Sequence, residues 1–224
     1  MQFFLRTNVP TSWWAALLPL AVLGGVLWMP IRASGAKPPP PSGLPDLTLD
    51  AARLASSMVI QTLSFTSASC EVVEGCVQST GTRRVLRFDV SVRNTGTGNL
   101  SLGNPQNNPL YQYSPCHGHY HFSNFATYEL VGLTNTARKQ AFCLEDYEPI
   151  PGYPNPPSRQ FTCNKQGISV GWQDTYRSIL PCQWLDITGV PSGTYTLRVT
   201  VDPFNLIPET DNNNNIGQAT VTIP

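Results

Sequence analysis

The stretch Ser-Pro-Cys-His-Gly-His-Tyr-His-Phe, residues 114–122, contains all three histidines of the chain. In an extended strand, residues two positions apart point to the same face, roughly 6 to 7 Å from one another. The spacing of His117, His119 and His121 therefore predicts a strand on which three imidazoles converge on one metal ion. Imidazole favours copper, zinc, iron or nickel, and copper has the highest affinity of the divalent ions. The alternative is a solvent-facing histidine-rich strand that binds metal only by accident.

Around this stretch, alternating apolar and polar residues rich in Val, Thr, Phe and Tyr predict further strands. The predicted strands are Met58–Phe65, Arg84–Val92, Phe125–Val131, Thr194–Val201 and Gln218–Ile223. Clusters of Gly, Pro and Asn between them indicate turns and loops, above all within residues 131–181. A short helix is expected at Asp50–Ser57. The pattern predicts a mainly β fold, an antiparallel β-sandwich core with long loops and little helix.

The beginning of the chain has the composition of an export segment. Arg6 and Arg32 enclose 25 uncharged, mostly apolar residues, so residues 1–36 are expected to be a signal peptide. The same length also allows an uncleaved N-terminal membrane anchor. Residues 37–43 are rich in proline and are expected to be a linker, followed by one domain over 44–224. In either case we expect a secreted or extracytoplasmic protein.

Six cysteines, an even number in an exported chain, predict three disulfides among 15 possible pairings. They are Cys70, Cys76, Cys116, Cys143, Cys163 and Cys182. No Cys-x-x-Cys pair is present, so a thiolate zinc site is not expected. Cys116 precedes His117 directly, and we expect it to hold the histidine strand through a disulfide; the alternative is a copper thiolate.

Charged residues are few and balanced, with 14 basic and 14 acidic side chains. This balance argues against a nucleic-acid surface and against a strongly basic membrane patch. A small-molecule substrate is compatible with it.

The chain resembles the lysyl oxidase family of copper amine oxidases, which carry a lysine tyrosylquinone. The resemblance rests on Cys116-His-Gly-His-Tyr-His121, and then on Lys139-Gln-Ala-Phe-Cys-Leu-Glu-Asp146, Gly171-Trp-Gln-Asp-Thr-Tyr176 and Cys182-Gln-Trp-Leu-Asp-Ile187. It continues through residues 193–197 and 202–215 and reaches back to Leu44-Pro-Asp-Leu47. Order and spacing are kept over about residues 44–222. The resemblance implies that 44–224 is a lysyl oxidase-like catalytic domain.

The resemblance also implies roles for individual residues. His117, His119 and His121 would bind copper, and Lys139 and Tyr176 would form the quinone. The implied activity is oxidation of primary amines, either peptidyl lysine or small amines, by dioxygen to aldehydes, with release of hydrogen peroxide and ammonia.

The general base is where the chain departs from the family pattern. Animal lysyl oxidases typically carry acidic residues just after the third histidine, whereas Phe122-Ser-Asn-Phe125 stands here. Asp174, two residues before Tyr176, is the expected base, with Glu145 and Asp146 as further candidates. Each of these is alternatively a structural carboxylate that holds a loop.

Two cysteines common in the family are also missing, with Glu148-Pro149 and Trp172 in their places. Loss of both halves of one bridge leaves three others. By resemblance, these are Cys70 with Cys116, Cys76 with Cys182, and Cys143 with Cys163.

A second metal site is implied near the C-terminus, with oxygen ligands of the kind that calcium takes. The ligands implied are Asp46, the Leu47 carbonyl, Glu209, Asp211, Asn214 and Asn215. The alternative is an exposed asparagine-rich turn between two strands.

Three functional hypotheses remain. The first is an exported copper- and quinone-dependent amine oxidase, and the second is a non-catalytic copper-binding relative. The third is a β-sandwich cell-surface adhesion module with an incidental histidine strand. The presence of Lys139 and Tyr176 at the matching positions favours the first hypothesis. The third hypothesis does not explain why Cys116 lies beside His117.

Overall fold

The computed structural model describes residues 43–134, 136–141 and 143–224. The expected export segment and all but the last residue of the expected linker lie outside these ranges. Within the described ranges, no helix is long and apolar enough to cross a membrane.

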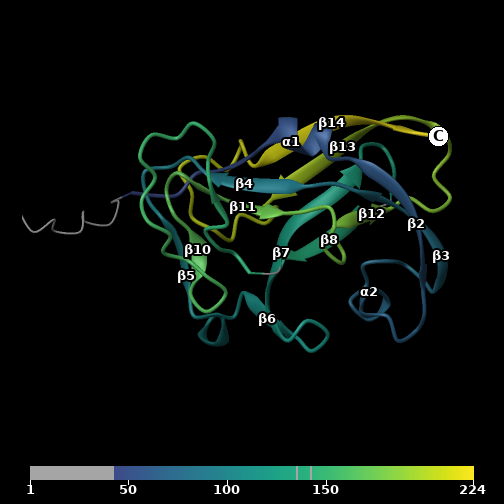
Figure 1. The fold of residues 1–224 in the computed structure, drawn as a ribbon, viewed down its shortest axis with the longest axis horizontal. Coiled ribbons are helices and arrows are strands. Elements are labelled where there is room, and N and C mark those ends of the chain that lie inside the picture. Colours follow the sequence, from purple (N-terminus) through teal and green to yellow (C-terminus); the bar gives the residue numbers. More distant parts are fainter. Residues whose placement is uncertain (1–42, 135, 142) are drawn as a thin grey trace, which may run out of the picture. The chain divides into compact units, whose positions relative to one another are not determined.

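Short and medium strands are the main regular structure of the described chain (Figure 1). In chain order they are β1 Leu47–Leu49, β2 Val59–Phe65, β3 Gly81–Arg87, β4 Val90–Asn94, β5 Leu100–Gly103, β6 Tyr111–Ser114, β7 His119–Leu130, β8 Thr136–Ala141, β9 Glu148–Pro149, β10 Gln166–Ile168, β11 Trp172–Tyr176, β12 Trp184–Asp186, β13 Gly193–Val201 and β14 Ile216–Ile223. The helical elements are α1 Ala51–Ser56, α2 Cys70–Val73 and the 3-10 turn Pro105–Asn107.

All the strand pairs are antiparallel. One sheet has the order β1-β4-β11-β9, and the largest has the order β14-β13-β7-β6, with β8 also paired to β7. Two smaller sheets have the orders β12-β3-β2 and β10-β5. The predicted antiparallel, mainly β fold is confirmed.

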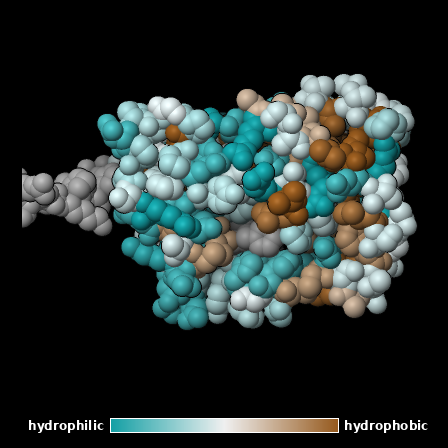
Figure 2. Space-filling model, in the orientation of Figure 1, coloured by the Kyte–Doolittle hydropathy of each residue, from teal (hydrophilic) through white to brown (hydrophobic). Residues whose placement is uncertain are grey.

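The two larger sheets bury their apolar faces in one core. Val90 and Val92 of β4 belong to the same buried cluster as Tyr128 of β7 and Leu197 and Val199 of β13. Along β14 buried and exposed residues alternate strictly, as expected for a strand with one face on the core and one in solvent. Figure 2 shows the result on one side of the molecule, a mostly polar surface with apolar residues gathered toward one end.

Helix α1 forms where it was expected. Asp50 caps it by accepting a hydrogen bond from the Arg53 backbone N–H. Leu54 is its buried residue and packs into the main core.

The predicted strand Arg84–Val92 is wrong in one respect, because it is two strands in different sheets. The chain leaves β3 at Arg87 and enters β4 at Val90, and buried Asp89 lies between them. Its backbone N–H donates to the Ser57 hydroxyl, and its carboxylate accepts from the Ser178 N–H at 2.7 Å. The alternation of apolar and polar residues continues unchanged where the chain passes from one sheet to the other. The sequence pattern therefore could not reveal this change.

Residues 131–181 contain more regular structure than predicted. Four strands, β8 to β11, lie in this region, and β11 pairs with β4 inside a larger sheet. Most of these strands are too short for an alternation signal, and β11 is buried at four of its five positions.

The disulfides are Cys70–Cys116, Cys76–Cys182 and Cys143–Cys163, the pairings that the resemblance implied. Two of them attach the segment around α2, a helix with no buried residue of its own. The third closes the loop between β8 and β10. Covalent links therefore reinforce the attachment of these segments to the apolar clusters they border.

We expect removal of the Cys76–Cys182 bridge to destabilise the fold more than removal of Cys143–Cys163. The bridged residues are 106 and 20 positions apart, and loop entropy gives about 4.7 kcal/mol for a loop of about 100 residues and about 3 kcal/mol for a short one. Urea unfolding of the two double Cys→Ala variants measures the difference. Equal losses would show that loop length does not determine the effect.

Candidate functional site

The three histidines lie on the hairpin formed by β6 and β7. His119 and His121 belong to β7, whereas His117 lies in the turn before it. Gly118 has a φ of +69°, in the left-handed region that favours glycine. The prediction of one strand carrying all three histidines is therefore wrong for His117, because the chain turns at Gly118.

The imidazoles nevertheless gather at one place. The Nε2 atoms of His119 and His121 are 3.2 Å apart, and the ring of His117 lies 5.2 and 5.8 Å, centroid to centroid, from those of His121 and His119. Nitrogens bound at 2.0–2.1 Å to one tetrahedral ion would be about 3.3 Å apart. The spacing of His119 and His121 thus fits two ligands of a single ion.

Burial favours the neutral form of the His119 ring. His121 is 1% exposed, and desolvation lowers the pKa of His119. Because metals bind the neutral imidazole, this environment suits a ligand.

Glu74 lies beside the histidines and was not among the residues singled out from the sequence. It follows α2, and its Oε1 is 3.2 Å from Nδ1 of His117. Ligand atoms of Glu74, His117 and His121 all lie within 4.8 Å of one another. The sequence did contain one signal for Glu74. It lies between Cys70 and Cys76, and Cys70 was expected to be linked to Cys116, the residue before His117.

Tyr176 and Asp174 form a buried pair on one face of β11. Each is 3% exposed, and the Tyr176 hydroxyl donates to Oδ2 of Asp174 at 2.7 Å. Burial raises the pKa of Asp174 to about 8, against the opposing effect of that hydrogen bond. Burial and the neighbouring Asp174 also raise the pKa of Tyr176. The pair thus holds a proton that can be exchanged near neutral pH.

An aromatic contact joins this pair to the histidine strand. Phe125 of β7 packs against the Tyr176 ring with centroids 6.2 Å apart, and against Phe122 at 5.7 Å. The backbone of Lys139 lies on β8, opposite Ala126 of β7. The structure therefore places Tyr176 and the backbone of Lys139 on elements that adjoin β7 (Figure 1); the side chain of Lys139 is outside the described part.

The two further base candidates are engaged elsewhere. Asp146 is fully buried and accepts hydrogen bonds from the backbone N–H groups of Gln160, Phe161 and Ser169. Glu145 pairs with Arg159 at 2.5 Å near the surface. These contacts are those of structural carboxylates.

Five of the six residues of the implied calcium site, all except Asp211, meet where the start of the domain contacts its last turn. Asn214 donates to Asp46 at 2.9 Å, and the Leu47 N–H and Asn215 both donate to Glu209. Burial raises the pKa of Glu209 to about 7.

Among the described buried side-chain atoms, Oδ1 of Asn214 and Oδ1 of Asn215 have no hydrogen-bond partner. Asp211 is exposed and accepts from the backbone of Asn213. Buried oxygens without donors are what a hard cation would satisfy.

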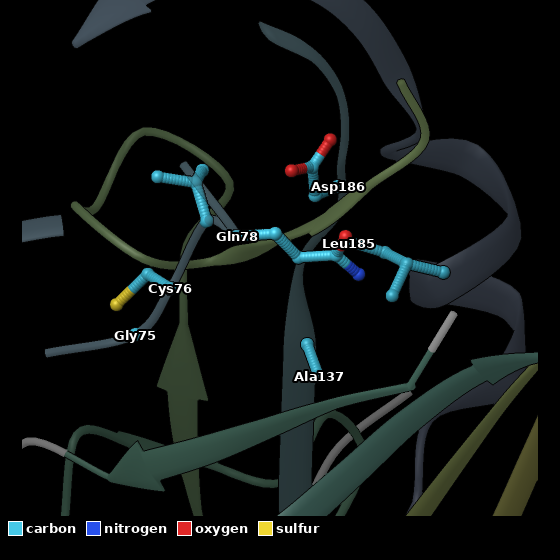
Figure 3. Close-up of a pocket in the computed structure, with 7 residues that line it drawn as sticks. Gly75, Cys76, Gln78, Ala137, Leu185 and Asp186 are labelled. Atoms are coloured by element: carbon cyan, nitrogen blue, oxygen red, sulfur yellow. The ribbon is translucent and has the colours of Figure 1, made fainter. Parts of the chain in front are cut away.

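A cavity of about 40 Å³ lies beside the Glu74 segment (Figure 3). It is lined by Gly75, Cys76, Val77, Gln78, Ala137, Leu185 and Asp186. Arg83 neutralises its one carboxylate, that of Asp186, at 2.6 Å. The volume is large enough for a few water molecules but too small for the amine-bearing side chain of a peptide substrate.

These features describe a disulfide-linked antiparallel β-sandwich domain with a histidine cluster. The family model for lysyl oxidase matches residues 45–223, and the chain belongs to this family. Protein-lysine 6-oxidase of Sus scrofa is 36% identical over 78% of the chain and 74% of its own length. The Homo sapiens protein of the same name is also 36% identical, over 78% of the chain and 44% of its own length.

Lysyl oxidase homolog 1 of Homo sapiens is 33% identical over 78% of the chain and 32% of its own length. The match thus covers most of the Sus scrofa protein and less than half of these two human proteins.

The Asp174–Tyr176 pair makes stability depend on pH. With a pKa of about 8 in the folded chain and about 3.9 in the unfolded chain, Asp174 holds more protons when folded at pH values between these two. Stability should therefore fall as pH rises from about 4 to about 8.

We expect Asp174→Asn to remove this dependence in the metal-free chain before any cofactor forms. Between pH 5 and pH 8, the free energy of unfolding of the native chain should fall, relative to that of the variant, by on the order of a few kcal/mol. Denaturant unfolding at each pH measures it, with Glu129→Gln as the control, because Glu129 pairs with Arg198 and is not among the groups that shift the pKa of Asp174. Parallel pH profiles for the native chain and Asp174→Asn would contradict the assignment.

Proposed function

We propose that this chain is an exported copper- and quinone-dependent amine oxidase, with residues 44–224 as its catalytic domain. Family membership and the name protein-lysine 6-oxidase of its relatives support an amine substrate. The observation that carries the proposal is the approach of the His119 and His121 Nε2 atoms to 3.2 Å beside His117. This donor set fits copper, with His117, His119 and His121 as ligands.

Lys139 and Tyr176 are the proposed precursors of the quinone. When bound, copper and the quinone supply the two-electron oxidation of a primary amine, peptidyl lysine or a small amine, by dioxygen and water, giving an aldehyde, ammonia and hydrogen peroxide. The position of the Lys139 backbone on the strand next to β7, and the packing of Tyr176 on Phe125 of β7, support this pairing.

Asp174 is the proposed base. Its Oδ2 accepts a hydrogen bond from the Tyr176 hydroxyl, and a pKa of about 8 lets it take up and release protons near neutral pH. The surrounding Tyr176, Phe125 and Leu144 are buried and exclude water from this proton.

We also propose that the chain acts outside the cytoplasm. Three disulfides support an oxidising compartment. Residues 1–36 would direct export, as a cleaved signal peptide or as an N-terminal anchor, and residues 37–43 would be a spacer.

The quinone is tested in copper-loaded, air-exposed protein by titration with phenylhydrazine and mapping of cross-linked peptides. We expect a coloured adduct in the native chain and none in Lys139→Ala or Tyr176→Phe. Lys165→Ala and Tyr128→Phe are matched controls, because they remove a lysine and a buried tyrosine elsewhere and should keep the adduct. Tight copper binding with no adduct in the native chain would reject the oxidase and leave a copper-binding relative.

We propose further that calcium binds among Asp46, Leu47, Glu209, Asp211, Asn214 and Asn215 in a structural role. Among the described buried atoms, the two asparagine oxygens that lack donors support this proposal. Calcium would then tie the start of the domain to its last hairpin.

Added calcium should raise the Tm of the native chain by mass action. Glu209→Gln should largely remove this increase, whereas Glu129→Gln, which alters an ion pair with Arg198 on β13, should keep it. Scanning calorimetry with and without a chelator gives both values. An identical calcium response in Glu209→Gln and the native chain would argue against this site.

A further inference from the structure

Glu74 is held close to the histidine cluster by two covalent links. It lies four residues after Cys70, which is bonded to Cys116, and two before Cys76, which is bonded to Cys182. Cys116 is the residue directly before His117. No residue of α2 is fully buried, and Val72 packs only partly against a small apolar cluster. The two bonds therefore help to fix Glu74 relative to His117.

The Glu74 carboxylate contacts one nitrogen of the His117 ring. Its Oε1 lies 3.2 Å from Nδ1 of His117, and both side chains are only 13% exposed. The Ser114 hydroxyl donates to the same carboxylate oxygen, and the hydroxyl oxygen accepts from the His117 backbone N–H at 3.2 Å. Glu74, Ser114 and His117 thus form a connected polar group at the turn of the hairpin.

This contact distinguishes the two nitrogens of His117. An imidazole that donates Nδ1–H to a carboxylate is fixed in the tautomer whose free lone pair is on Nε2. His119 and His121 already face each other through Nε2. With Nδ1 turned to Glu74, His117 would bind a metal through Nε2, the same nitrogen through which His119 and His121 face each other.

We propose that Glu74 is the positioning residue of the metal site: its carboxylate accepts the Nδ1–H of His117 and so directs Nε2 of His117 to the ion. The proposal rests on the proposed copper site. Such a carboxylate also places negative charge near the ion and increases the basicity of the ligand. Ser114 would keep the carboxylate in place.

A contrast with Glu71 distinguishes this role from a general structural one. The carboxylate contacts a histidine of the cluster directly, whereas Glu71, on the same short helix, is in no described group of metal-binding side chains. Loss of the Glu74 carboxylate should therefore change the bond between His117 and the metal, with Glu71→Ala as the matched control.

The test compares the native chain with Glu74→Ala, Glu74→Gln and Glu71→Ala. Copper affinity is measured by competition with a chromophoric chelator. The state of each imidazole nitrogen is read by NMR in zinc-loaded, ¹⁵N-histidine-labelled protein, in which zinc is diamagnetic and the quinone does not form. The chain has only three histidines, so each ring is resolved.

We expect Glu74→Ala to weaken copper binding about 10- to 100-fold and to speed solvent exchange of the His117 Nδ1–H. Glu71→Ala should do neither. Glu74→Gln keeps an acceptor oxygen and should lose less affinity, and it serves as the second variant if Glu74→Ala misfolds. Disulfide mapping and thermal unfolding confirm that each variant is folded.

Native copper affinity in folded Glu74→Ala would overturn the positioning role, and so would a native protein in which His117 binds zinc through Nδ1. Either result leaves the copper site itself standing. A native chain that binds no copper tightly would overturn the proposed function and this inference together.

Discussion

The packing of β7 constrains both the sandwich and the histidine cluster. The second half of this strand buries Ala126, Tyr128 and Leu130 in the core and pairs with β13. The first half carries His119 and His121 and pairs with β6. A rigid core strand thus continues directly into the candidate metal site, which is how a scaffold positions ligands with little conformational freedom.

The change between the two halves of β7 occurs at one irregularity. The register with β8 shifts between Phe122 and Ala126, and Asn124 has a φ of +58°. Asparagine tolerates this left-handed conformation better than most residues. The segment Phe122–Phe125 shapes the strand and carries no carboxylate. The base candidate nearest to Tyr176 is therefore Asp174 on β11.

Strand alternation was sufficient to predict the sandwich, and it failed where the chain turns. It gave β2, β13 and β14 nearly to their ends, but it joined β3 to β4 across Asp89 and placed His117 on β7. Alternation reports which face a residue occupies and carries no information about where a strand ends.

Contacts between distant parts of the sequence were beyond the local pattern. The disulfide pairings came from resemblance, since cysteine spacing permits every pairing. Glu74 was missed because a glutamate 43 positions before His117 has no local feature that ties it to a histidine. Only the fold, through Cys70–Cys116, brings them together.

Two buried aspartates on neighbouring segments show how surroundings assign different roles to one residue type. Asp146 receives three backbone N–H groups and the Ser169 hydroxyl, so its two oxygens are fully occupied in holding a loop. Asp174 receives one backbone N–H and the Tyr176 hydroxyl. At Asp174 desolvation outweighs these hydrogen bonds and raises the pKa to about 8.

That desolvation depends on the aromatic residues that separate the two halves of the site. Three edge-to-face contacts connect four aromatic rings. Tyr111 contacts Phe122, Phe122 contacts Phe125, and Phe125 contacts Tyr176. All four are at most 8% exposed. Rings in such contacts pack closely and keep their neighbours buried.

The series of rings therefore sets the separation between the histidine strand and Tyr176 and also keeps the proton between Tyr176 and Asp174 out of solvent. Because both effects come from the same rings, the geometry of the site and its proton affinity cannot vary independently in this fold.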